Sequence, residues 1–317
     1  MSRPFPADSS TAAPPDPALT GGTALARRRL GVWAIVFFVI SAAAPLTVVA
    51  SAAPTDFRLA GIGGPGAMLA SGVVLMLFAV GFTAMSRYVR NAGAFYIYGA
   101  KGLGKPVGIG IVFVTIFSYA ALCICFYGFV GFFGEMTFDA LFGIKLPWTV
   151  YALIAFLAVG ILGYRKIDVG AKVLAVLLTA EVAILLVLAI GVLAQGGPEP
   201  ISFAAFAPQN VFFAAGSGAL FVFGFGAYLG FESTAIYTEE AIRPARTVPM
   251  ATYIAIAFLV VFYAFTFWIL TVAFGIDGVL KLAQQDTFQD MVFDAGEQYL
   301  GLWASITMRI LIVTSFF

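Results

Sequence analysis

A glutamate follows three glycines in the stretch FGFGAYLGFES at residues 223–233, inside a run of membrane-spanning length. Gly224, Gly226 and Gly230 weaken a helix, and Glu232 adds a carboxyl that lipid does not tolerate unpaired. Such residues must face the interior of a helix bundle or a water-filled space. The stretch therefore predicts an interrupted span that exposes backbone groups beside an ionisable side chain.

A second interruption is predicted at residues 41–47, which read SAAAPLT. Pro45 removes a backbone donor and crowds the preceding turn, and it also favours the first turn of a new half-helix. Half-helix N-termini attract a carboxylate and unwound carbonyls attract an ammonium group, so we expect both stretches to meet in a substrate site. The expected site residues are Ser41, Ala42, Ala43, Ala44 and Thr47, with Phe223, Gly224, Phe225, Gly226 and Ala227. Because glycine and proline are common in transmembrane helices, spacing alone leaves ordinary helices as an alternative.

Three ionisable residues lie deep in predicted spans: Glu181, Glu232 and Arg309. Each is costly there, so each should face the bundle interior or water. We predict that Glu232 and Glu181 exchange the coupling proton as water access changes from one side to the other. The alternatives are a structural carboxyl at Glu232, hydrogen-bonded to nearby backbone, and an ion pair between Glu181 and Arg309.

Thr314 and Ser315 place two adjacent hydroxyls in the last apolar run. Hard cations prefer oxygen ligands, so the pair is a candidate sodium site together with carbonyls of the first span. The competing interpretation is that both hydroxyls bond to the backbone of their own helix.

Enzyme chemistry has little support in this chain. It contains no histidine, so zinc sites with histidine ligands and histidine-activated nucleophiles are excluded, and we predict no metal, no cofactor and no enzymatic activity. Glu239 and Glu240 form an acidic pair near the membrane interface. Ion pairing with Arg243 and Arg246 explains that pair more simply than a catalytic cluster does.

The elements that position these residues are membrane spans. Of 317 residues, 62% are hydrophobic and 10% are charged, with a mean hydropathy of +1.01, more apolar surface than a soluble domain of this length can bury. The chain is therefore predicted to be an all-α integral membrane protein in the lipid bilayer. A net charge of +1 gives no support for binding to nucleic acid.

Residues 1–29, rich in Pro, Ala, Ser and Gly, are predicted to form a disordered tail, and a single transmembrane domain is expected over 30–317. Apolar runs of spanning length lie near 30–54, 65–86, 106–133, 147–164, 169–194, 211–237, 249–274 and from 299 onward. The final run stops at Phe317 without a polar flank. We therefore expect the chain to end inside an eighth span and to be part of a longer protein.

The distribution of basic residues predicts the orientation. With the tail in the cytoplasm, thirteen Lys and Arg residues lie inside and three, Arg58, Lys145 and Lys281, lie outside. This bias predicts a multi-pass protein of the cell membrane with a cytoplasmic N-terminus. Residues 275–298 then form an acidic outer loop, which we expect to be partly helical along the surface and to present a solvated face.

The segment GFGAYLGFESTAIYTEEAIRPARTVP, which starts at Gly224, and RNAGAFYIYGAKGLGKPVG at 90–108 resemble the amino acid-polyamine-organocation permeases. The resemblance implies the leucine-transporter-type inverted-repeat helical bundle, with a first repeat at about 30–194 and an incomplete second repeat at about 211–317. It also implies that Glu232 occupies an acidic position associated with proton-dependent coupling or gating. Many members have a Gly-Ser-Gly-like run where this chain reads Ser-Ala-Ala-Ala-Pro from Ser41 to Pro45.

The predicted function is secondary active transport of an amino acid or related amine by alternating access, as proton-coupled symport or exchange. The alternatives are sodium-coupled transport and a membrane receptor or scaffold that does not transport. Tyr119, Cys123 and Phe126 of the third span are candidates to complete the pocket, but periodicity does not choose between their faces. The identity of the substrate and the oligomeric state stay open.

Overall fold

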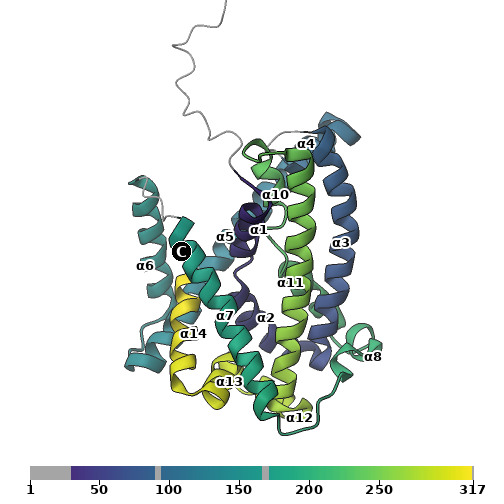
Figure 1. The fold of residues 1–317 in the computed structure, drawn as a ribbon. Helices are drawn as coiled ribbons and strands as arrows, with labels where there is room; N and C mark the ends of the chain where they lie inside the picture. Colours follow the sequence, from purple (N-terminus) through teal and green to yellow (C-terminus); the bar gives the residue numbers. More distant parts are fainter. Residues whose placement is uncertain (1–29, 90–93, 166–170, 316–317) are drawn as a thin grey trace, which may run out of the picture.

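The computed structural model describes residues 30–89, 94–165 and 171–315. Every named element of this part of the chain is a helix (Figure 1), which confirms the predicted all-α architecture. Within these described ranges, four helical segments are long and apolar enough to cross a membrane: Pro45–Ser86, Lys105–Phe142, Val173–Gln195 and Pro244–Phe274. The predicted disordered tail at 1–29 lies outside the described residues.

Most predicted spans correspond to one long helix each. These helices are α3 (Gly64–Tyr88), α5 (Lys105–Phe142), α6 (Trp148–Tyr164), α7 (Ala171–Gln195), α11 (Pro244–Phe274) and α14 (Leu302–Ser315). A shorter helix, α4 (Ala94–Leu103), precedes α5. The first and sixth predicted spans are each divided, as their sequences predict. The first becomes α1 (Val32–Ala42) and α2 (Pro45–Ala60), and the sixth becomes α8 (Pro208–Phe212), α9 (Ser217–Gly226) and α10 (Ser233–Ile236).

Helix α11 forms the centre of the bundle and is buried along most of its length. It lies beside α3, as Figure 1 shows, and contacts α1 and α7 as well. A side chain at Gly72 of α3 would collide with Val260 of α11, so glycine is needed where the two helices cross closely.

The two divided spans lie against each other in opposite directions. Half-helix α1 contacts α10, and α2 contacts α9. The first half of one span, α1, therefore lies beside the last half of the other, α10. The two divided spans run antiparallel. The short links at Ala43–Ala44 and at 227–232 therefore fall at the same level of the bundle.

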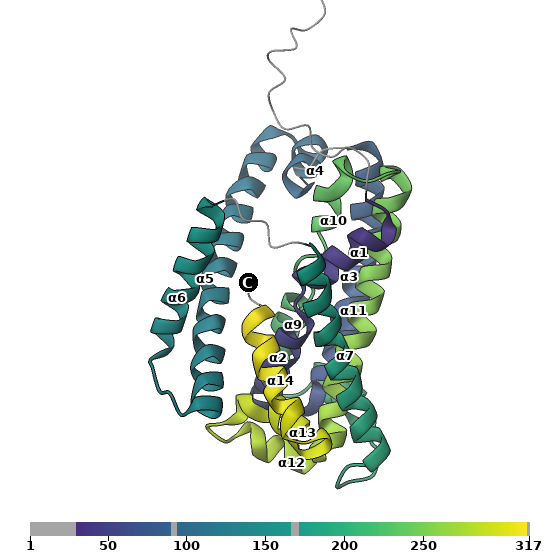
Figure 2. The same ribbon diagram turned by 60° about the vertical axis from the view of Figure 1, so that its left-hand side comes forward.

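Helices α5 and α6 pack together along one side of the bundle (Figure 2). Gly131 and Gly134 of α5 permit this approach, because an added Cβ would press on Trp148 or Tyr151 of α6. One face of α5 is thereby left to line the space between this pair of helices and the divided spans.

The segment at 275–298 is helical, as predicted, and contains α12 (Ile276–Ala283), a 3₁₀ turn at Phe288–Asp290 and the start of α13 (Met291–Leu300). The expected solvated face is only part of the structure, because Met291, Val292 and Phe293 are buried against the bundle. Burial of these apolar side chains is favourable, although the acidic composition of the segment predicts a solvated face. The segment is a packed cap over one end of the bundle.

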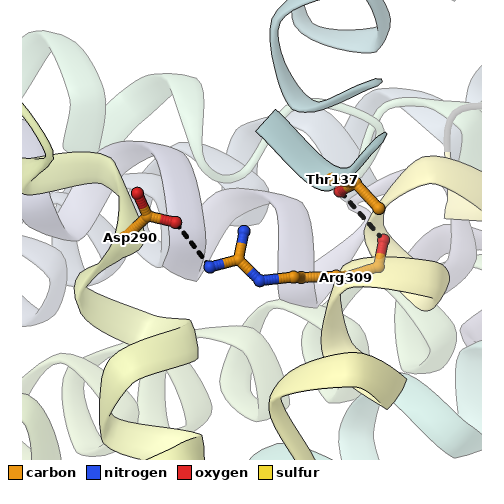
Figure 3. A network of polar contacts seen from close by, with 3 residues as sticks. All are labelled: Thr137, Asp290 and Arg309. Atoms are coloured by element: carbon orange, nitrogen blue, oxygen red, sulfur yellow. Dashed lines mark hydrogen bonds and ion pairs between the residues drawn. The ribbon is translucent and has the colours of Figure 1, made fainter. Parts of the chain in front are cut away.

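Arg309 of α14 anchors this cap (Figure 3). Its Nη2 atom lies 2.6 Å from Asp290 Oδ1, and its Cζ atom lies 4.5 Å from the centre of the Phe293 ring. The Thr137 hydroxyl of α5 donates to the Arg309 carbonyl at 3.5 Å. The alternative pairing of Arg309 with Glu181 is therefore wrong, because Asp290 supplies the nearer carboxylate.

Candidate substrate site

The first break is a sharp turn held by side chains from distant helices. Ala44 has a left-handed backbone with φ of 42°, and Pro45 starts α2 directly after it. The Tyr263 hydroxyl of α11 donates to the Ala43 carbonyl at 3.1 Å. The Leu46 backbone N–H donates to Glu181 Oε2 of α7 at 3.3 Å. These two backbone groups of the break therefore have partners on other helices.

The second break, residues 227–232, is closed by its own residues. Gly230 has φ of 104°, a conformation that side chains rarely adopt. Its N–H donates to Glu232 Oε2 at 2.9 Å, and its carbonyl accepts a hydrogen bond from the Ser233 hydroxyl at 2.6 Å. A Cβ at Gly230 would lie 3.1 Å from the Ala42 Cβ, so the two breaks are in direct contact.

A cavity of about 770 Å³, which we call the break cavity, opens where the breaks meet. Its volume is typical of a site for a small molecule. Seven of the predicted site residues line it: Ala42, Ala43, Ala44, Thr47, Phe223, Gly226 and Ala227. The predicted meeting of the two stretches is therefore present in the structure, whereas substrate binding by these residues stays a prediction.

Three predicted site residues lie elsewhere. Ser41 does not line the break cavity, because the last turn of α1 directs Ala42 and Ala43 toward it instead. Gly224 is buried against α3, where a side chain would collide with Ser71, so its role is close helix packing. Phe225 lines a different cavity, described below. Helical rotation separates neighbours by about 100°, so adjacent residues of one motif cannot all face one cavity.

Helix α5 and the cap complete the break cavity. Phe126 lines it, as the sequence allowed, together with Phe129, Phe132 and Phe133. Gln289 of the cap reaches it as well, which the sequence did not reveal. The hydroxyl spacing at Thr47, Ser51 and Thr55 is one signal that could have shown the polar face of α2 opposite these residues.

A second cavity, of about 920 Å³, lies on the α4 side of the breaks, and we call it the Glu232 cavity. Glu232 and Tyr119 line it, and the Tyr119 hydroxyl donates to Glu232 Oε1 at 2.6 Å. The two cavities share Leu122, Cys125 and Leu229 as lining residues, so a thin wall separates them. Cys123 lines neither cavity.

Glu181 is buried beside the first break. Besides its bond from Leu46, its carboxylate has the Ser315 hydroxyl of α14 as a hydrogen-bonding neighbour. The Thr314 hydroxyl donates to its own helix, to the Ile310 and Leu311 carbonyls at 3.2 and 2.9 Å. Ser315 therefore faces the break, whereas Thr314 is engaged with its own backbone.

Asp56 of α2 is a buried carboxyl that the sequence interpretation missed. It is fully buried, and neither of its oxygens has a hydrogen-bond partner among the described residues. It lies against Gly64, where α3 begins. The sequence placed Asp56 just beyond the first predicted span, but α2 continues to Ala60 and carries it into the bundle.

The acidic pair Glu239 and Glu240 forms no ion pair with Arg243 or Arg246 in the part of the chain that the structure describes. Backbone pairing replaces the expected bridges. The Leu30 N–H donates to the Glu240 carbonyl at 3.1 Å, and the Ile242 N–H donates to the Leu30 carbonyl at 3.0 Å. The start of α1 is thereby tied to the loop that follows α10.

An apolar helical bundle with two antiparallel broken helices and cavities at their breaks defines the class of helical membrane transport proteins. The family model described as amino acid permease matches residues 30–317, so the chain belongs to this family of the amino acid-polyamine-organocation superfamily. This confirms the resemblance seen in the two sequence motifs and indicates amino acid transport across a membrane. No curated protein matches the chain.

Proposed function

We propose that the protein is a secondary active transporter of amino acids or related amines, which works by alternating access and is coupled to protons. The observation that carries the proposal is the pair of cavities that share Leu122, Cys125 and Leu229 at the level of both breaks. A site between two such cavities can be reached from one side and then from the other by small movements of the half-helices.

The break cavity offers complementary groups for both ends of an amino acid. The N-terminus of α2, a helix of 16 residues, attracts the carboxylate of the substrate at the first break. Carbonyls of the link at 227–232 attract its ammonium group. The polarity of the two ends fixes the orientation of the substrate and directs its side chain toward α5.

Glu232 is the residue that we propose for proton coupling. As a carboxylate it accepts hydrogen bonds from Tyr119 of α5 and from Gly230 of the second break. Protonation would remove the negative charge and add an O–H donor, so the hydrogen bonds from Tyr119 and Gly230 would weaken. The proton therefore changes the contact between α5 and the second break, which is the wall between the cavities. Glu181 is the second proton candidate, since it holds the first break through Leu46.

Two structural features accompany this proposal. The antiparallel divided spans support an inverted repeat, with a first half at about 30–194 and a second half at about 211–317. The bias of basic residues favours a cytoplasmic N-terminus and an outer position of the α12–α13 cap. The Glu232 cavity then lies on the inner side of the breaks.

Sodium coupling is the second candidate, and one contact favours it. The Ser315 hydroxyl and the Glu181 carboxylate lie together beside the first break. Such oxygens are suitable ligands for a hard cation. Uptake driven by a sodium gradient without a proton gradient would favour this mechanism over the one through Glu232.

The test is uptake by the full-length protein in liposomes over about pH 5 to 8. Glu232→Gln keeps the shape but removes the exchangeable proton, so the variant should bind substrate while its uptake loses pH dependence. Asp294→Asn is the control, because partial burial and the nearby Asp290 raise the pKa of the Asp294 carboxyl in the cap to about 6. An unchanged pH profile in Glu232→Gln, or an equal change in Asp294→Asn, would contradict the assignment.

A further inference from the structure

The break cavity has an uncharged lining. Among the described residues that line it, there is no Asp, Glu, Lys or Arg. Glu232 lies beyond the shared wall in the other cavity, and neither Arg309 nor Asp290 lines the break cavity. A charged side chain of a substrate would therefore find no counter-charge in the break cavity and would lose its hydration without compensation.

One wall of the break cavity is aromatic. Phe126, Phe129 and Phe133 recur on one face of α5, and Phe132 lies beside them. Phe223 of α9 also lines the cavity. Aromatic rings offer large apolar surfaces and favourable contacts with other rings, so this wall suits a bulky apolar group.

The opposite wall carries neutral hydrogen-bonding groups in a fixed order along α2. The Ser51 hydroxyl donates to the Thr47 carbonyl at 2.7 Å, and the Thr55 hydroxyl donates to the Ser51 carbonyl at 2.7 Å. Because the only hydroxyl proton of Thr55 is used there, the Gln289 amide nitrogen must donate to Thr55, at 3.0 Å. The amide of Gln289 is thereby oriented, with its oxygen as the remaining acceptor.

Two atoms of this wall are left for a ligand. The Thr47 hydroxyl oxygen and Gln289 Oε1 are buried and have no hydrogen-bond partner among the described residues. The Thr47 side chain is 4% exposed and lies beside the first break, where the backbone groups of an amino acid are expected. Buried polar groups are normally paired, and these neutral atoms can bond to polar groups of a substrate without supplying a counter-charge to its side chain.

Building on the proposed function, we propose that the break cavity selects amino acids with a bulky, uncharged, apolar side chain and excludes those with charged side chains. The ammonium and carboxylate groups of the substrate lie at the two breaks, beside Thr47. Its side chain packs on the phenylalanines of α5. Phenylalanine and leucine are the model substrates of this class, and lysine and glutamate are the excluded ones.

The proposal is tested by uptake of phenylalanine, leucine, alanine, lysine and glutamate into liposomes that contain the full-length protein. Phenylalanine and leucine should be taken up with kcat/KM at least about 100-fold above that of lysine or glutamate, because a pocket that leaves a charge unpaired rejects it strongly. Alanine should be an intermediate substrate, since it fills little of the cavity.

Gly128→Leu locates the side-chain pocket. Gly128 lines the break cavity, and an added Cβ there meets no atom within 4 Å, so the new side chain enters open space. We expect the KM for phenylalanine to rise by about 10-fold or more while that for alanine changes less. Gly110→Leu is the matched control, because Gly110 lies on the same helix, has equally open surroundings and lines neither cavity.

These uptake measurements distinguish the proposed selectivity from the transport function on which it rests. Absence of uptake for every amino acid would overturn both. Uptake of lysine or glutamate as efficient as that of phenylalanine would leave the transport function intact and overturn the selectivity. Equal kinetics of Gly128→Leu and Gly110→Leu for phenylalanine would show that the side chain lies elsewhere and would also overturn the proposal.

Discussion

The two breaks meet at the same cavity, but their backbones are held in different ways. At the first break, the Ala43 carbonyl and the Leu46 N–H have their partners on α11 and α7, in Tyr263 and Glu181. At the second break, both backbone groups of Gly230 are paired within three residues along the chain. The first break therefore depends on the assembled bundle, whereas the second is encoded locally.

The residues in left-handed conformations show the same difference. Gly230, at φ of 104°, is a glycine, whereas Ala44, at φ of 42°, is not. An alanine in this region of backbone space is strained by about 1 to 2 kcal/mol. The surrounding bundle must offset this cost at the first break, and the second break has no such cost to offset.

Gly230→Ala should have the largest effect on stability. It places a side chain at positive φ, and the new Cβ would lie 3.1 Å from the Ala42 Cβ. We expect a loss of about 2 kcal/mol or more in the free energy of unfolding, measured by thermal unfolding in detergent. The control is Gly226→Ala, because a Cβ at Gly226 meets no atom within 4 Å. Equal losses in both variants would show that the second break has no special need for glycine.

Tyr263→Phe should have the next largest effect. Tyr263 is fully buried, and the variant loses the hydroxyl that donates to the Ala43 carbonyl. We expect this to lower the free energy of unfolding by about 1 to 2 kcal/mol. Ser233→Ala removes the corresponding bond of the second break, to the Gly230 carbonyl, which is only part-buried. The Ser233 N–H still donates to this carbonyl, at 3.1 Å, so the loss of the hydroxyl should cost only about 0.5 kcal/mol. A larger loss in Ser233→Ala than in Tyr263→Phe would reverse the comparison.

What the sequence could predict follows from the same difference. Pro45 marks the first break and Gly230 the second, because their effects on the backbone are local. The partners at the first break could not be predicted, since Tyr263 is 220 residues from Ala43 in the chain. The two motifs predict that Ser41 and Gly224 belong to the site, because a motif does not indicate which of its residues face the cavity. Asp56 was missed because the end of α2 depends on its packing against the cap.

Ala44→Gly should have a small effect, and its sign is the sharpest test of the comparison. Glycine relieves the strain of the left-handed backbone at Ala44 but loses more conformational entropy on folding, about 0.5 to 1 kcal/mol. The net result should be a gain of about 0.5 kcal/mol in the free energy of unfolding. Ala43→Gly is the matched control, because Ala43 has φ of −75° and ψ of −11°, a conformation that alanine adopts without strain. That variant should lose about 0.5 to 1 kcal/mol, since only the entropic cost applies. Thermal unfolding of both variants under identical conditions gives opposite signs if the first break is strained, and a loss in both would show that it is not.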